Sequence, residues 1–203
     1  EAVAVEGPAG LRVIVGNSGV GSLLRLSRSR LEMVLEKTRD LDDSTDFLIL
    51  DVASGADARV ITFLAFADEA ILVTTPDPTS IVDCYSTAKV LLRRKKDADI
   101  SVLVNRVRGP DEGRRVFETL NSAMSRFLRR QASCLGYVEE DQAAADIGRA
   151  CGPFVLADSR LPASTDIATI AALLAQTRSG ARLADVIARR VHARGSGIHT
   201  LAA

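Results

Sequence analysis

Residues that suit phosphate and metal chemistry follow an apolar run at 47-FLILDV-52. Asp51 lies near the end of this run, and Ser54 and Gly55 come shortly after it. A carboxylate in that position can hold a magnesium ion through water, while a serine and a glycine let the backbone approach a phosphate closely. The alternative is that Asp51 caps the helix that follows, and the residues alone leave both interpretations open.

Two further apolar runs end in residues that could help to bind a ligand. One leads into 74-TTPDPTS-80, where Pro76 and the next proline fix an extended turn before a helix. The other, 100-ISVLVN-105, ends at Asn105, whose amide carries both a donor and an acceptor that suit the edge of a nucleobase. An asparagine there is also an ordinary turn residue, so this interpretation needs a fold that brings the run ends together.

A glycine-rich loop within 10-GLRVIVGNSGVGSL-23 comes close to a phosphate-binding P-loop. That pattern requires Gly, four residues, Gly, Lys and then Ser or Thr. Gly16 and Gly21 have the required separation, but Ser22 stands where the lysine belongs. The loop is therefore either an eroded phosphate site or a glycine loop of another kind.

The hydrophobic pattern that must position these residues alternates short apolar runs with longer helical segments. Several runs are apolar at successive positions, which is typical of strands covered on both faces. The predicted buried strands are 11–15, 47–52, 69–75, 100–105, 134–138 and 153–157. The predicted helices are 25–41, 79–95 with a Thr/Ser cap, and 112–130 with Val116, Leu120, Met124, Phe127 and Leu128 on one face. This alternation predicts an α/β fold of three layers, α/β/α, around a mostly parallel sheet, which binds ligands at the carboxyl ends of its strands.

Composition restricts the partners. Among 203 residues, 26 are Lys or Arg and 26 are Asp or Glu, so the chain as a whole offers no field that attracts nucleic acid or an anionic membrane. Its three cysteines are far apart in the sequence, without a CxxC pair, which argues against a zinc site or a disulfide framework and for a reducing cytoplasm. No apolar run approaches the length of a membrane span, and no signal peptide is recognisable.

The order of the strand ends resembles that of the MinD/ParA group of P-loop ATPases, which carry a deviant Walker A motif. The resemblance runs from about residue 5 to about residue 177 and rests on the phrases DFLILDVASGAD, VTTPDPTSIVDCY, SVLVNRVRG and the closing GY…ED…A…PF…P.S block. Within the group, the chain is most similar to the MinD-like regulators of flagellar number and placement, the FlhG/YlxH type. The resemblance implies a P-loop NTPase fold and a nucleotide-dependent switch.

On the phosphate side, the resemblance implies that Asp51 is the Walker B aspartate. It would be a catalytic residue and would hold Mg²⁺ through water. The segment 51-DVASGAD-57, with Ser54 and Gly55, would be the switch II loop. The implied cofactors are ATP or ADP together with Mg²⁺.

On the base side, the resemblance implies that Asn105 contacts adenine. The segment 137-YVEED-141, which contains Val138 and Asp141, would flank the base, and Pro76 would lie in the loop that supports the nucleotide. These three segments follow different predicted strands, so the implied site again requires the parallel sheet.

The same resemblance implies that the glycine-rich loop is not an eroded P-loop. In the flagellar MinD-like ATPases, a phrase similar to VEGPAGLRVIVGNSGVG lies just upstream of the Walker B strand, after the true P-loop. The Walker A motif belongs to an N-terminal strand-helix-strand unit of about 30 residues or more, and only ten residues precede Leu11. The chain also opens on Glu1 instead of methionine. We therefore expect either that it is part of a longer protein or that other packing, such as oligomerisation, covers the missing unit. Residues 1–203 by themselves are expected to be marginally stable and inactive as an ATPase.

The resemblance also divides the chain into two parts. Residues 1–178 are expected to form a partial MinD/ParA-like ATPase domain, and residues 179–203 a basic amphipathic helix and tail. The helix at 180-GARLADVIARRVHARGSG-197 suits either an anionic membrane or docking on protein. The basic run 93-RRKK-96 is expected to be a solvated helix end rather than a nucleic-acid patch.

Two classes of function follow. The first is a nucleotide switch: ATP-dependent homodimerisation and hydrolysis that regulate the placement or number of a cellular structure, with flagella favoured. Its implied partners are an SRP-type GTPase of flagellar assembly and basal-body proteins, and its location is the cytoplasm or, peripherally, the inner face of the cell membrane. The alternatives are a nucleotide-free interaction module that has lost the phosphate-binding half, or a ParA/MinD relative that positions chromosomes or septa.

Overall fold

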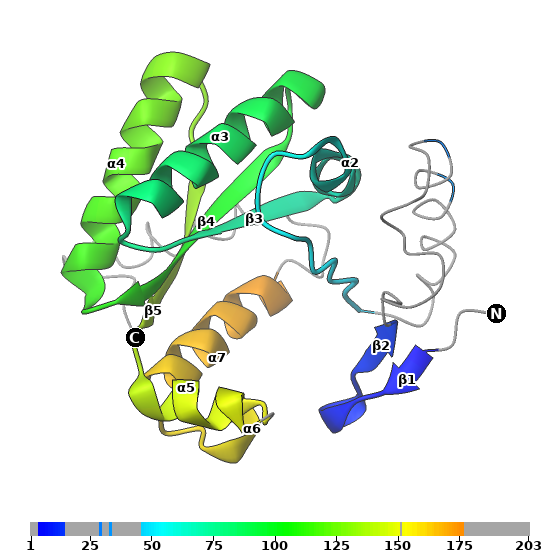
Figure 1. The fold of residues 1–203 in the computed structure, drawn as a ribbon, viewed down its shortest axis with the longest axis vertical. Coiled ribbons are helices and arrows are strands. Elements are labelled where there is room, and N and C mark those ends of the chain that lie inside the picture. Colours follow the sequence, from blue (N-terminus) through cyan, green and yellow to red (C-terminus); the bar gives the residue numbers. More distant parts are fainter. Residues whose placement is uncertain (1–3, 15–28, 30–32, 34–45, 151, 177–203) are drawn as a thin grey trace. The chain divides into compact units, whose positions relative to one another are not determined.

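The computed structural model describes residues 4–14, 29, 33, 46–150 and 152–176 (Figure 1). The chain divides into two compact units, Glu1–Asp46 and Phe47–Ala203. Two predictions lie outside the described residues: the glycine-rich loop with Gly16, Gly21 and Ser22, and the C-terminal helix at 180–197. The predicted helix at 25–41 also lies outside them, apart from residues 29 and 33.

The first unit contains a short antiparallel hairpin. Strand β1 (Ala4–Glu6) pairs with β2 (Arg12–Ile14), and a 3-10 turn, η1 (Pro8–Gly10), connects them. Gly10 has φ = 79°, a left-handed backbone that glycine adopts without steric strain. A strand forms within the predicted run 11–15, but every residue of β2 is exposed, so the prediction that this strand is buried is wrong. The physical reason is local: the turn at Pro8–Gly10 reverses the chain, so that β2 pairs with β1 in a hairpin.

A parallel three-stranded sheet organises the second unit. Its strands are β3 (Glu69–Thr74), β4 (Asp99–Val107) and β5 (Ser133–Glu139), in the spatial order β3-β4-β5. Each strand is connected to the next by a helix, α3 (Pro78–Arg94) and then α4 (Pro110–Leu128), as parallel neighbours require. These five elements confirm the predicted α/β class.

One face of the sheet is covered by α3 and α4, with α2 (Ala58–Phe66) beside α3 (Figure 1). Alternate strand residues point into this layer. The buried core here includes Ala70, Leu72, Val102, Val104, Leu91, Leu120 and Met124. Full burial of a Leu, Val or Met side chain contributes about 1.5–3 kcal/mol, so this layer is the main source of stability for the strands that carry the site.

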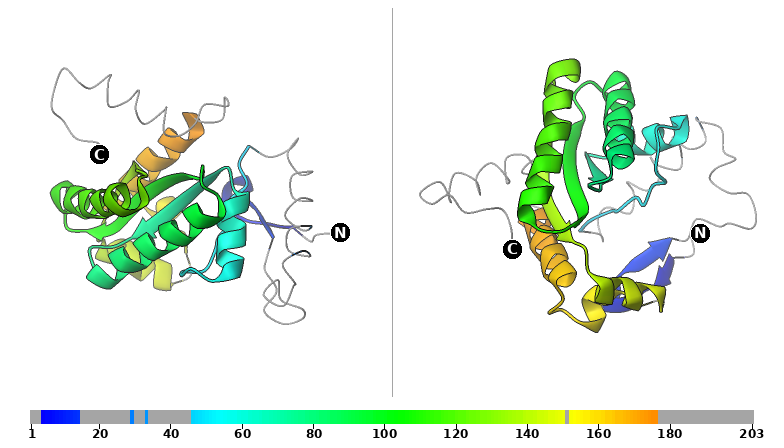
Figure 2. Two further views of the ribbon diagram at one scale, coloured as in Figure 1. Left: turned by 90° about the horizontal axis from the view of Figure 1, so that it is seen from above. Right: turned by 60° about the vertical axis from the view of Figure 1, so that its left-hand side comes forward.

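The opposite face is covered by α7 (Pro162–Ala175), which follows α5 (Gln142–Arg149) and α6 (Phe154–Ala157). Leu103 packs into this second layer beside Leu135 and Ile170, whereas its neighbours Val102 and Val104 belong to the first layer. That alternation places α7 on the other side of the sheet from α3 and α4 (Figure 2). The predicted three-layer arrangement is thereby confirmed.

The second face is uncovered at β3. Side chains of Ile71 and Val73 are 38% and 55% exposed, although both are apolar. Among the described strands, β3 pairs with β4 alone, so its outer edge carries no described partner. The sheet therefore has one well-packed side and one open corner.

Two predicted strands are not strands. Residues 47–52 form no ladder, and Phe47, Leu48 and Ile49 are 45%, 49% and 82% exposed. A strand is held by hydrogen bonds to a neighbour, and no described strand pairs with this segment. The prediction at 153–157 is also wrong, because the backbone N–H groups of Leu156 and Ala157 donate to Pro153 O and so close the helical turn of α6.

The apolar face of α4 is shorter than predicted. Val116, Leu120 and Met124 are buried, but Phe127 is 66% exposed. Its ring lies in the last turn of the helix, where the Arg126 guanidinium is 5.3 Å from the ring centroid. The cation–π contact covers one face of the ring, which reduces the apolar surface that the exposed ring presents to water.

Candidate functional site

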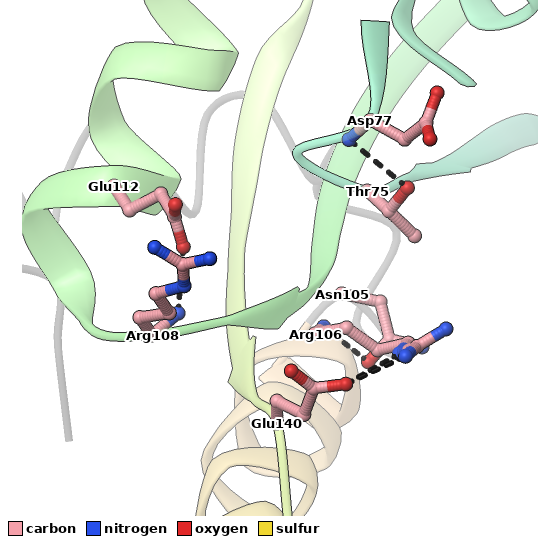
Figure 3. A network of polar contacts seen from close by, with 7 residues as sticks. All are labelled: Thr75, Asp77, Asn105, Arg106, Arg108, Glu112 and Glu140. Carbon is pink, nitrogen blue, oxygen red and sulfur yellow. Dashed lines mark hydrogen bonds and ion pairs between the residues drawn. The ribbon is translucent and has the colours of Figure 1, made fainter. Parts of the chain in front are cut away.

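The carboxyl ends of β3, β4 and β5 meet at one edge of the sheet. Because the three strands are parallel and adjacent, the segments that follow Thr74, Val107 and Glu139 emerge side by side. Figure 3 shows the polar side chains of this edge, from Thr75 and Asp77 after β3 to Glu140 after β5. This is the edge at which parallel α/β sheets bind ligands.

The turn after β3 is held by hydroxyl groups and a helix cap. The backbone N–H of Thr75 donates to Ser80 Oγ at 3.0 Å, and that of Thr79 donates to Asp77 Oδ1 at 2.7 Å. Asp77 is therefore the N-cap of α3, and the predicted Thr/Ser cap is wrong. The Thr79 hydroxyl also donates to Asp77 Oδ1, at 2.6 Å. This bond, with that from the Thr79 N–H, holds the pKa of the Asp77 carboxyl below its ordinary value. Pro76 lies half-buried within the turn.

At the end of β4, Asn105 is half-buried and Arg106 is exposed. The Oδ1 atom of Asn105 accepts the backbone N–H of Arg106 at 2.9 Å. The Arg106 guanidinium donates to Glu140 Oε1, at 3.1 Å from Nε and 2.6 Å from the terminal nitrogen. Further along, the backbone N–H of Arg108 donates to Glu112 Oε2 at 2.7 Å, which anchors the start of α4.

The segment after β5 is tied to the helices that follow. Asp141 is the N-cap of α5: its Oδ1 accepts Ala144 N–H at 3.1 Å, while Oδ2 lies 3.5 Å from the donating Ala163 N–H. The side chain of Val138 is buried in the second core layer. These contacts show that Val138 and Asp141 hold the segment in place. Both side chains are engaged within the protein.

The phosphate-side candidates lie apart from these contacts. Asp51, Ser54 and Gly55 are exposed in the segment before α2, and Gly55 has the left-handed φ of 104°. Asp57, not Asp51, caps α2, since its Oδ1 accepts Arg59 N–H at 2.9 Å; the capping interpretation of Asp51 is wrong. Within the described part of the chain, no hydrogen bond joins the three candidates to the ends of β3, β4 or β5.

The described residues contain no group of three or more His, Cys, Asp or Glu side chains placed to hold a metal ion. The magnesium role of Asp51 therefore stays a prediction. A membrane-crossing helix, long and apolar enough to span the bilayer, does not occur in the described ranges either.

The structure thus brings together the base-side candidates Asn105, Pro76 and the 138–141 segment. It adds Arg106, which sequence reasoning missed, and it makes Glu140, part of the predicted 137–141 segment, the ion-pair partner of Arg106. The signal for Arg106 was weak, a basic residue directly after a predicted strand. The arrangement presents a half-buried amide with a defined orientation at the edge of the sheet, which is the chemistry needed to hydrogen-bond a nucleobase.

Comparison with known proteins gives several relatives. The chain is 33% identical over 140 residues to the antiactivator FleN of Pseudomonas aeruginosa, covering 69% of this chain and 50% of FleN. It is 33% identical over 112 residues to the flagellum site-determining protein YlxH of Helicobacter pylori, covering 55% and 37%. It is 28% identical over 180 residues to an uncharacterized ATP-binding protein of Methanocaldococcus jannaschii, covering 88% and 63%. No protein-family model matches the chain.

Among solved structures, the MinC:MinD cell division protein complex of Aquifex aeolicus is similar, with a TM-score of 0.57 and 20% sequence identity over 86% of this chain and 62% of that one. The described domain therefore has the α/β fold of MinD. The chain belongs to the MinD/ParA group of P-loop ATPases, close to the FlhG/YlxH type. It spans about half the length of the curated relatives it matches.

Proposed function

We propose that the chain supplies the base-binding part of a MinD-like nucleotide switch, with ATP or ADP and Mg²⁺ as its cofactors. One observation carries this proposal: the amide of Asn105 lies half-buried at the carboxyl edge of a parallel sheet, in the middle strand of three. A relative described as ATP-binding matches 88% of the chain, which supports ATP as the nucleotide.

The residues of the described edge fit the base end of a nucleotide. An amide in this setting can hydrogen-bond a base edge, and Pro76 and the 138–141 segment form its surroundings. Phosphate binding would fall to Asp51, Ser54 and Gly55 together with the P-loop unit that the family resemblance implies. In that setting Mg²⁺ would neutralise the developing charge on the phosphates, and Asp51 would hold its water ligand.

The cellular role that we propose is control of the placement or number of flagella through ATP-dependent homodimerisation and hydrolysis. The relative YlxH, named a flagellum site-determining protein, supports this branch. Septum positioning is the alternative, because other relatives are named septum site-determining proteins. An SRP-type GTPase and basal-body proteins are the partners that fit this role, and a basic helix in 180–197 would give the dimer a peripheral membrane contact.

The decisive experiment is calorimetric titration of ATP with Mg²⁺ into the longest reading frame that contains the chain, and into residues 1–203 alone. We expect binding and Asp51-dependent hydrolysis in the longer protein, and no hydrolysis by residues 1–203. Asn105→Ala is expected to weaken ATP binding about 3- to 10-fold, the effect of one neutral hydrogen bond. Ser86→Ala, on the outer side of α3 with its hydroxyl bonded to Val82 O, serves as the matched surface control.

Each part of the proposal has its own contrary result. Failure of the longer protein to bind ATP would leave the nucleotide-free interaction module as the function. A monomeric state with ATP, measured by analytical ultracentrifugation, would exclude the dimer switch. Equal co-sedimentation with anionic liposomes, with and without residues 180–203, would exclude the membrane contact.

A further inference from the structure

The orientation of the Asn105 side chain is fixed by a backbone donor. Its Oδ1 atom accepts the Arg106 N–H at 2.9 Å. A backbone N–H can only donate, so the oxygen of the amide must face it, and the NH₂ group must face away. No described residue accepts a hydrogen bond from that NH₂ group. The side chain therefore presents its two N–H donors to a ligand, while one lone pair of its oxygen is engaged by the backbone.

The residue that supplies this donor, Arg106, has an uncommon backbone. The residue has φ = 58°, in the left-handed region that arginine seldom occupies. It is also the extra residue of an irregularity between β4 and β5: Asn105 pairs with Val138 and Val107 with Glu139, so Arg106 has no partner of its own. Because Arg106 has no partner in the β5 register, its N–H is free to donate to the preceding side chain.

The side chain of Arg106 is anchored on the neighbouring strand end. Its guanidinium makes two hydrogen bonds to Glu140 Oε1, and the backbone N–H of Glu140 donates to Val107 O at 2.8 Å. The side chains of this ion pair are 67% and 52% exposed, so the pair contributes little to the stability of the fold. Its effect is geometric, because it holds residue 106 between two strand ends.

We propose that Arg106 is a positioning residue for base recognition. Its left-handed backbone and its ion pair with Glu140 keep it outside the β4–β5 register. Its N–H therefore stays bonded to the oxygen of Asn105, so that the NH₂ group faces the ligand and donates a hydrogen bond to a ring-nitrogen acceptor of a purine. This inference rests on the proposed function, since it names how the same edge reads its nucleotide.

The binding test compares ATP with 7-deaza-ATP and 1-deaza-ATP, each of which lacks one ring-nitrogen acceptor, on the longest reading frame that contains the chain. We expect one of the two analogues to bind the wild type about 3- to 10-fold more weakly than ATP, the loss of one neutral hydrogen bond. Arg106→Val should abolish this preference, because a β-branched residue disfavours a positive φ. Arg106→Gly and Arg106→Asn, which accept the left-handed turn, should retain most of it.

A second readout does not need a nucleotide. Amide hydrogen exchange of residue 106, followed by NMR, reports the bond to Asn105 Oδ1. Protection is expected in the wild type and in Asn105→Asp, which keeps an acceptor oxygen, and is expected to be lost in Asn105→Ala and in Arg106→Val. Because Asn105→Asp lacks the NH₂ donor, it should keep the protection and lose the preference for ATP over the analogue.

The outcomes separate the two proposals. A wild type that binds no ATP overturns the proposed function, and this inference falls with it. A wild type that binds ATP and both analogues equally, or a preference that persists in Arg106→Val, overturns the role of Arg106 and leaves the proposed function standing. An unprotected residue 106 amide in the wild type would contradict the geometry on which the role depends.

Discussion

Gly113 lies so close to the ring of Tyr137 that a β-carbon at position 113 would be 2.5 Å from Tyr137 Cδ1 and Cγ. The glycine belongs to α4 and the tyrosine to β5, so the missing side chain lets the helix approach the sheet just below the candidate site. No turn or positive φ requires glycine here. Glycine is required here because a side chain would have no room beside the Tyr137 ring.

Gly113→Ala is therefore expected to destabilise the domain. Overpacking a well-packed contact costs about 1–3 kcal/mol, against about 1 kcal/mol that alanine gains over glycine inside a helix. Urea unfolding should show a lower free energy of unfolding for the variant. Gly148→Ala in α5 is the control, because a β-carbon there meets nothing within 4 Å and should be neutral or slightly stabilising.

The stability of the sheet should depend on the protonation of Glu69. Burial raises the pKa of this carboxyl, the Ser101 hydroxyl that donates to it at 2.5 Å opposes the shift, and Asp99, its partner across the strands, adds to it. A raised pKa in the folded state means that Glu69 stabilises the fold at low pH and that this stabilisation is lost as the pH rises through its folded pKa. Relative to Glu69→Gln, the wild type should be more stable at about pH 4 than at about pH 8.

Asp77 provides a control of opposite sign. Its pKa is lowered by the bonds from Thr79, so its stabilisation is present above the ordinary pKa of 3.8 and is lost as the pH falls through the lower folded value. Relative to Asp77→Asn, the wild type should gain stability as the pH rises. If the stability of the wild type relative to each variant, measured by denaturant unfolding, changed with pH in the same direction for Glu69 and Asp77, one of the two assignments would be wrong.

The thiol of Cys84 is expected to be inert in the native state. It is 6% exposed, and burial raises its pKa to about 11 from 9.0. The thiolate fraction at neutral pH is then about 100-fold lower than that of an ordinary cysteine. Iodoacetamide labelling followed by mass spectrometry should modify Cys84 only after denaturant is added. Rapid native labelling at this position would show that α3 opens locally.

The exposure of Ile49 predicts a difference between two forms of the protein. In residues 1–203 its side chain is 82% exposed, so Ile49→Ser should change the free energy of unfolding by no more than about 0.5 kcal/mol. In a longer protein where a P-loop strand pairs with residues 47–52, the same change should cost about 2–5 kcal/mol. Equal effects in the two proteins, measured by urea unfolding, would refute pairing at this segment.

The middle of the fold was predictable because its signals are local and strong. Three apolar runs became β3, β4 and β5, and the helical periodicity of Val116, Leu120 and Met124 marked the buried stripe of α4. The short helices α5 and α6 carry too few turns for a periodic pattern. Residues 47–52 have the composition of a buried strand, but a strand forms only where a neighbour supplies hydrogen bonds, and composition does not encode that neighbour.

The candidate site was predictable in its residues but not in its geometry. Asn105 follows an apolar run, and the chemistry of an amide suggested base recognition. Nothing in the pattern indicated that Arg106 adopts a positive φ, since arginine has no preference for that region. The caps were also misassigned, because Asp51, Asp57, Thr79 and Asp77 all suit a helix start and only the backbone geometry distinguishes them.

The open edge of β3 has a consequence for handling the isolated chain. No described strand pairs with the outer edge of β3, and unpaired backbone groups beside a run of Ala, Ile, Leu and Val are the kind of template on which further chains add as strands. No charged residue interrupts 70–73 to oppose such pairing. Exposed Ile71 and Val73 would enlarge such a contact. Aggregation of residues 1–203 should therefore rise steeply with concentration, and a lysine in place of Val73 should suppress it without touching the first core layer.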